Sequence, residues 1–189
     1  MIIDGELWAR ELHLNGFYIL EADEPQLPAL GALDDHIWFE SSESRENGML
    51  CKIKNEYETN IANFFKSNIL PFGKSIWGNP SFLDVCVNRG VEQSSYVAHT
   101  DYHDGDIDFF ALLYPTYWNS DLYGGHLVIE NRCQNSSGGM KVIAPTITKI
   151  VILNNMNPYF KHKVTSIHPS DEILNRALCT VSWKRGNFR

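Results

Sequence analysis

Three side chains that can bind a metal occupy alternate positions in YVAHTDYHDG, residues 96–105. They are His99, Asp101 and His103. Residues two apart on a β-strand lie on the same face, so His99 and Asp101 would present an imidazole nitrogen and a carboxylate oxygen side by side. A first-row transition metal can bind both groups. His103 falls beyond the strand in a glycine-containing loop, as a solvated histidine, a neighbour of the metal ligands or a residue facing the substrate.

A metal site needs a third ligand, and the candidate is His162 in YFKHKVTSI, at the start of a later predicted strand. Two histidines and one carboxylate on one face of an octahedron leave three coordination positions open, as non-haem Fe(II) oxygenases require. This mixed ligand set suits ferrous iron. Considered without His162, the pair His99 and Asp101 is better explained by a surface ion pair or a hydrogen-bonded loop histidine than by a metal site.

Short strands are the elements that would position these residues. Eight short apolar or alternating runs follow Pro80, with Gly, Asn, Pro and Ser between them. They are SFLDVCVN, SSYVAHT, DFFALLYP, GGHLVIEN, GMKVIAP, TKIVILNN, HKVTSIH and RALCTVSW. Because no helical period appears among them, they favour an antiparallel sandwich or barrel over a parallel α/β sheet. A jelly roll uses eight strands and has an open end where side chains converge.

The first 80 residues lack this regular succession. Apolar residues from Tyr57 to Trp77 recur at helical spacing until Pro71 interrupts them, which predicts a helix. Residues 2–13 predict a short helix, GFYILEA predicts a strand, and residues 25–44 read as irregular. We therefore expect one domain, residues 1–189, in which a helical and irregular part, 1–80, packs on a mainly β core, 81–185.

Composition argues against several classes of function. The net charge of −7, with no cluster of Lys and Arg, argues against a nucleic-acid partner. Arg10 and acidic residues interrupt the N-terminal segment where a signal peptide needs an apolar run, and no apolar stretch approaches the ~20 residues of a membrane span. The four cysteines are scattered without a CxxC pair, which predicts reduced thiols in a cytoplasmic protein. The oligomeric state is left open.

The order of the motifs resembles the 2-oxoglutarate- and Fe(II)-dependent dioxygenases, and within them the prolyl 4-hydroxylase-like branch. The resemblance covers roughly residues 81–183 and rests on the series YVAHTD, LLYPTYW, YGGHLVIE, KIVILNN, HKVTSI and RALCTVSW. It implies a double-stranded β-helix, which is a cupin-like jelly roll, with N-terminal helices packed outside. It also implies that the protein requires Fe(II), 2-oxoglutarate and O2.

Carried over by position, the resemblance makes His99, Asp101 and His162 the catalytic iron ligands. Arg176 would hold the far carboxylate of 2-oxoglutarate, because its planar guanidinium can form two parallel hydrogen bonds and keeps its charge. The carboxylate of Asp101 implies hydroxylation and not halogenation, because halogenating relatives have a small residue at that position.

Two tyrosines would complete the cosubstrate site. The hydroxyl of Tyr114 would assist the same carboxylate, or Tyr114 is simply a core aromatic; Tyr96 would form part of the pocket wall. If Arg176 is not the anchor, Lys184 is the alternative. The interval from His162 to Arg176 is longer than in the branch, so HPSDEIL must form an enlarged turn.

A glycine pair precedes a third histidine that could be mistaken for a metal ligand. His126 follows Gly124 and Gly125 at a position where relatives commonly have an acidic residue. The two glycines are expected to be turn or bulge residues.

The expected activity is hydroxylation of an unactivated carbon in a peptidyl proline, an amino acid or a small molecule, with release of succinate and CO2. Two alternatives share the fold class: a cupin-type metal protein, with His99 and His103 in a multi-histidine site, and a metal-free jelly-roll binding module. Cupins carry a glutamate after their first histidines, where this segment has aspartates. A binding module would not need Arg176 opposite a chelating triad.

Overall fold

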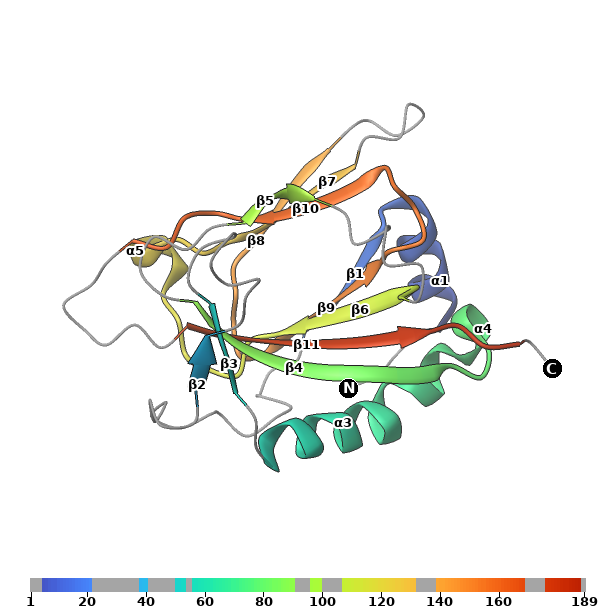
Figure 1. Ribbon diagram of the computed structural model, residues 1–189. Coiled ribbons are helices and arrows are strands. Elements are labelled where there is room, and N and C mark those ends of the chain that lie inside the picture. The colour runs from blue at the N-terminus through green and yellow to red at the C-terminus, as the bar shows by residue number, and fades with distance from the viewer. Residues whose placement is uncertain are drawn as a thin grey trace.

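Two antiparallel sheets face each other in the computed structural model, which describes residues 5–21, 38–40, 50–53, 56–90, 96–99, 107–131, 139–168 and 176–187. The large sheet has seven strands in the order β1-β9-β6-β11-β4-β3-β2, and the small sheet has four in the order β5-β10-β7-β8. Figure 1 shows the small sheet above the large one.

The strands have the following bounds. The large sheet contains β1 (Phe17–Glu21), β2 (Trp38–Glu40), β3 (Leu50–Ile53), β4 (Ser81–Gly90), β6 (Phe109–Leu113), β9 (Lys149–Asn154) and β11 (Arg176–Lys184). The small sheet contains β5 (Tyr96–His99), β7 (Leu127–Asn131), β8 (Met140–Ile143) and β10 (Phe160–Val164).

From β4 onward the chain alternates between the two sheets. β4, β6, β9 and β11 belong to the large sheet, whereas β5, the pair β7 and β8, and β10 belong to the small one. This alternation is the winding of a jelly roll. Each of the eight predicted runs overlaps one of the strands β4 to β11, so the predicted mainly β fold is confirmed.

The N-terminal region differs from the expectation in one respect, because its strands join the large sheet. β1 pairs with β9 at one edge, and β3 pairs with β4 and carries β2 at the other. These strands cover the edges of β9 and β4, whose backbone groups would otherwise lack partners. The strand predicted in GFYILEA is confirmed as β1. Of the segment predicted to be irregular, 25–44, the structure describes residues 38–40, which form β2.

The predicted N-terminal helices are confirmed as α1 (Gly5–Leu14) and α3 (Glu56–Asn68), followed by the 3-10 turn η2 (Leu70–Gly73) and α4 (Lys74–Trp77). Pro71 lies in η2, where the missing N–H and the fixed backbone angle of proline end the longer helix. Figure 1 shows α3 along the face of the large sheet that is turned away from the small sheet.

Two hydrophobic cores separate these layers. The core between helices and large sheet contains the fully buried Trp8, Trp77 and Trp183. The core between the sheets consists of Phe110, Leu112, Tyr114, Leu127, Ile129, Ile143, Val151, Leu153 and Leu178. Along β6, odd-numbered residues belong to the first core and even-numbered residues to the second; on β11, Cys179, Val181 and Trp183 belong to the first core and Leu178 to the second. Phe110 and Leu112 on β6 and Leu178 on β11 therefore face the interior of the jelly roll.

Two predictions from composition concern the cysteines and the absence of a membrane span. Among the described residues, Cys86 and Cys179 form no disulfide. Burial raises the pKa of Cys179, with a smaller contribution from Cys86, so this thiol stays protonated. Among the helices of the described segments, none has the length and apolar character needed to cross a bilayer.

Candidate active site

The two predicted histidine ligands occupy paired positions on neighbouring strands. In the antiparallel pair of β5 and β10, His99 lies directly opposite His162. Residues paired in this way share a face of the sheet, with Cβ atoms about 4.5–5.5 Å apart. The backbone thus brings together two residues that the sequence separates widely. Asp101 and His103 lie outside the described residues.

The side chain of His162 faces the interior of the jelly roll. Its ring centroid lies 5.2 Å from that of Phe110, and the two ring planes are inclined by 55°. Phe110 belongs to β6 in the large sheet, on its inner face, and is 7% exposed. The imidazole of His162 therefore extends from the small sheet into the space between the sheets. The sequence analysis did not single out Phe110, although it shares an inner face with Tyr114, four residues later.

A β-bulge explains how Tyr96 shares this face. His162 pairs with His99 and Val164 pairs with Tyr96, so two steps on β10 match three steps on β5. On a regular strand, residues three apart lie on opposite faces, and an extra residue in the strand cancels that difference. The register thus pairs Tyr96 with the buried Val164, and the place of Tyr96 in the pocket wall stays a prediction.

The two predicted cosubstrate residues lie close to each other in the large sheet. Leu113 at the end of β6 pairs with Cys179 of β11, so Tyr114 follows next to Leu178, and both are buried in the inner core. Arg176 begins β11 two residues before Leu178. Tyr114 is a member of the inner core, and the place of Arg176 and Tyr114 in one cosubstrate site stays a prediction.

Lys184, the alternative anchor, lies at the other end of β11. It pairs with Ser81 at the start of β4, whereas Arg176 pairs with Gly90 at the end of β4. At about 3.3 Å per residue, the eight steps from Arg176 to Lys184 span roughly 26 Å. The two residues therefore lie at opposite ends of the strand, and Lys184 as the alternative anchor stays a prediction.

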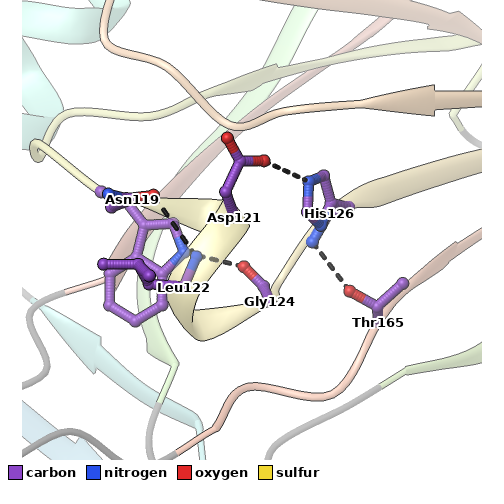
Figure 2. A network of polar contacts seen from close by, with 7 residues as sticks. Asn119, Asp121, Leu122, Gly124, His126 and Thr165 are labelled. Atoms are coloured by element: carbon purple, nitrogen blue, oxygen red, sulfur yellow. Dashed lines mark hydrogen bonds and ion pairs between the residues drawn. The ribbon is translucent and has the colours of Figure 1, made fainter.

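His126 belongs to a turn and is not part of the His99–His162 pair. It precedes Leu127, an inner-core residue, and so lies on the opposite face of the small sheet. Its Nε2 lies 3.9 Å from Oδ1 of Asp121, in helix α5 (Ser120–Tyr123), and its backbone N–H donates to Thr165 Oγ1 at 2.9 Å (Figure 2). His126 therefore ties α5 to the segment after β10.

The glycine pair before His126 shapes this turn, as predicted. Gly124 and Gly125 have φ angles of 71° and 74°, in the left-handed region. The Gly124 carbonyl accepts a hydrogen bond from Nε1 of Trp118 at 2.9 Å, and Asn119 Oδ1 accepts one from the Leu122 N–H (Figure 2). The Gly124 N–H also donates to the Ser120 carbonyl at 2.9 Å, so both backbone polar groups of Gly124 form hydrogen bonds.

Replacing Gly124 with alanine should lower the free energy of unfolding by at least about 1–2 kcal/mol, the cost of a left-handed residue with a Cβ. An added Cβ would lie 2.2 Å from the Ser166 carbonyl oxygen, so the backbone must also shift. Chemical denaturation measures the loss. Gly139→Ala is the matched control, because nothing lies within 4 Å of its Cβ position. Equal stability of the two variants would contradict the prediction.

The structure describes two of the three predicted metal ligands, His99 and His162, but not Asp101. Within the described segments, no group of three His, Cys, Asp or Glu side chains is arranged to hold a metal ion. His99 and His162 supply two paired positions, and Asp101 would supply the third ligand. The assignment of these three residues as ligands stays a prediction.

Comparison with known proteins adds evidence on the fold. No family model matches the sequence, and no curated protein matches it. Solved structures do match. A prolyl hydroxylase from Trichoplax adhaerens, in complex with a hypoxia inducible factor oxygen degradation domain peptide fragment, is 14% identical with a TM-score of 0.67 over 96% of this chain and 89% of its own.

Two bacterial structures agree with it. An oxidoreductase of the 2OG-Fe(II) oxygenase family from Burkholderia pseudomallei is 16% identical, with a TM-score of 0.60 over 98% of this chain and 92% of its own. A prolyl-4-hydroxylase from Pseudomonas putida is 15% identical, with a TM-score of 0.61 over 97% of this chain and 100% of its own. The chain has the fold of these oxygenases. The resemblance carried by the motif series is thus confirmed at the level of the fold, a double-stranded β-helix.

Proposed function

We propose that this protein is an Fe(II)- and 2-oxoglutarate-dependent dioxygenase that hydroxylates an unactivated carbon. The observation that carries the proposal is the pairing of His99 with His162 across β5 and β10, with the His162 ring pointing between the sheets. The position of Arg176 at the start of β11, beside the segment that follows β6, and the fold shared with 2-oxoglutarate oxygenases support it.

The donor set fits ferrous iron. Two imidazoles from paired strand positions are close enough to bind one ion, and Asp101, two residues after His99, would add a carboxylate. When bound, iron would supply the redox chemistry that couples decarboxylation of 2-oxoglutarate with O2 to hydroxylation, with succinate and CO2 as products. The ring of Phe110 restricts the orientation of the His162 imidazole that would bind it.

The chain itself would orient 2-oxoglutarate and exclude water. Arg176 would pair with the far carboxylate, and Tyr114, which is 3% exposed, lies at the same end of the inner core. The apolar side chains of Leu112 and Leu178 surround this region and keep water out. A charged pair is stronger in such surroundings than in water, because the local dielectric is low.

The substrate classes we propose are a peptidyl proline, an amino acid or a small molecule. One matched hydroxylase was solved with a peptide, and two are prolyl-4-hydroxylases, which supports peptidyl proline among the three. We also propose that the protein is cytoplasmic, has a single domain and does not bind membranes. From the acidic balance of the chain we propose that it does not bind nucleic acid.

Anaerobic addition of Fe(II) and 2-oxoglutarate tests the proposal. A visible metal-to-ligand charge-transfer band should appear, because the keto group and near carboxylate of 2-oxoglutarate chelate the metal. Succinate, which lacks the keto group, is the matched control and should give no band. A folded protein that gives no band with 2-oxoglutarate would favour the cupin-type protein or the jelly-roll binding module.

A further inference from the structure

Thr116 is a buried polar residue that joins two strands beside the cosubstrate site. It is 5% exposed and lies three residues after the end of β6. Its Oγ1 accepts a hydrogen bond of 3.0 Å from the backbone N–H of Ala177, the second residue of β11. Ala177 is itself 1% exposed, so water does not offer this N–H an alternative partner.

A side chain makes this contact because the backbone ladder has ended. The last pair between β6 and β11 is Leu113 with Cys179. Pro115 follows close by, and proline has no N–H with which to continue an antiparallel ladder. The hydroxyl of Thr116 therefore provides the acceptor that holds the start of β11 on the β6 side. On its other side, β11 is held by the pairing of Arg176 and Ala177 with β4.

Ala177 directly follows Arg176, so this hydrogen bond fixes the backbone from which the guanidinium extends. We propose that Thr116 is a positioning residue for Arg176. Its hydroxyl holds the backbone at the start of β11, so that Arg176 meets the far carboxylate of 2-oxoglutarate. This inference rests on the proposed function. Thr116 does not need to touch the cosubstrate, because it acts through the backbone at Ala177.

Substituting valine for Thr116 tests the inference, since valine keeps the shape and removes the acceptor. The Ala177 N–H would lose its partner, and the start of β11 would shift. We expect the dissociation constant for 2-oxoglutarate, read from the anaerobic charge-transfer band, to rise about fivefold, since misplacing a binding group by 1 Å costs up to about 100-fold. The KM for 2-oxoglutarate should rise equally, while kcat changes less than about twofold.

Three further variants separate positioning from general destabilisation. Thr116→Ser keeps the hydroxyl and should restore the wild-type dissociation constant. Thr165→Val removes a hydrogen bond of the same kind, from the His126 N–H to Thr165 Oγ1 at 2.9 Å, and should leave the dissociation constant unchanged at a similar loss of stability. If the valine variant does not fold, Thr116→Cys, with a weaker acceptor of similar size, should move the dissociation constant in the same direction.

A double-mutant cycle with Arg176→Met provides the decisive result. A residue that acts through Arg176 has nothing left to position once the guanidinium is gone, so T116V should add less than about a twofold change in that background. An unchanged dissociation constant in T116V, or an equal effect with and without Arg176, would overturn the inference. Absence of the band in the wild-type protein would instead refute the proposed function, so the two failures are distinguishable.

Discussion

Replacing His162 with alanine should eliminate the Fe(II)–2-oxoglutarate charge-transfer band and lower succinate formation by more than ~100-fold. Residues that merely orient a metal ligand cost about 10- to 100-fold when removed, and losing a ligand costs more. The expectation follows from the position of His162 opposite His99 and from its ring, which points between the sheets toward Phe110. Absorbance under anaerobic conditions and succinate release in air measure the two effects.

His126→Ala is the matched control for this experiment. His126 lies in the turn before β7, beside Asp121, on the face of the small sheet opposite to that of His162. Its loss should leave the band and the turnover within about twofold of the wild type. An active H162A protein would contradict the assignment of His162 as a metal ligand. An inactive H126A protein that is folded would contradict the placement of His126 outside the metal site.

The succession of strands could be predicted from the sequence because each strand carries its own signal. The alternation of apolar residues in runs such as DFFALLYP is local, and so is the spacing of His99 and Asp101. The short strands β2 and β3 could not be predicted in this way. With three and four residues, they carry no periodic pattern; β3 is stabilised by pairing with β4, and β2 by pairing with β3.

The arrangement of the candidate site depends on pairings that no local pattern determines. His99 and His162 meet because β5 and β10 adopt one particular register, and the bulge in β5 then brings Tyr96 to the same face. Phe110 and Thr116 were missed for the same reason, since their contacts are with residues far along the chain. An available signal was the alternation along β6, which continues from Phe110 to Tyr114.

One strand of the large sheet thus serves both halves of the candidate site. On the inner face of β6, Phe110 contacts the predicted ligand His162. Beyond the end of β6, Tyr114 and Thr116 lie beside the start of β11, where Arg176 is placed. A single stretch of backbone therefore joins the two halves of the candidate site.

Arg176→Met should raise the concentration of 2-oxoglutarate required for half-maximal band formation by about 10- to 150-fold. This range corresponds to the ~1.5–3 kcal/mol of a hydrogen bond to a charged group. Methionine keeps much of the length of the side chain but removes the charge and the donors. The titration is carried out anaerobically, so that binding is measured without turnover, and the KM for 2-oxoglutarate in air should change in parallel.

Two variants on β11 show whether the effect belongs to this position. Arg176→Lys retains the charge but not the planar pair of donors, so its dissociation constant should fall between those of the wild type and R176M. Lys184→Met removes a cation from the opposite end of the same strand, roughly 26 Å away, and should leave 2-oxoglutarate binding unchanged. If R176M binds 2-oxoglutarate as the wild type does, the far carboxylate has a different anchor, and the titration of K184M shows whether Lys184 is that anchor.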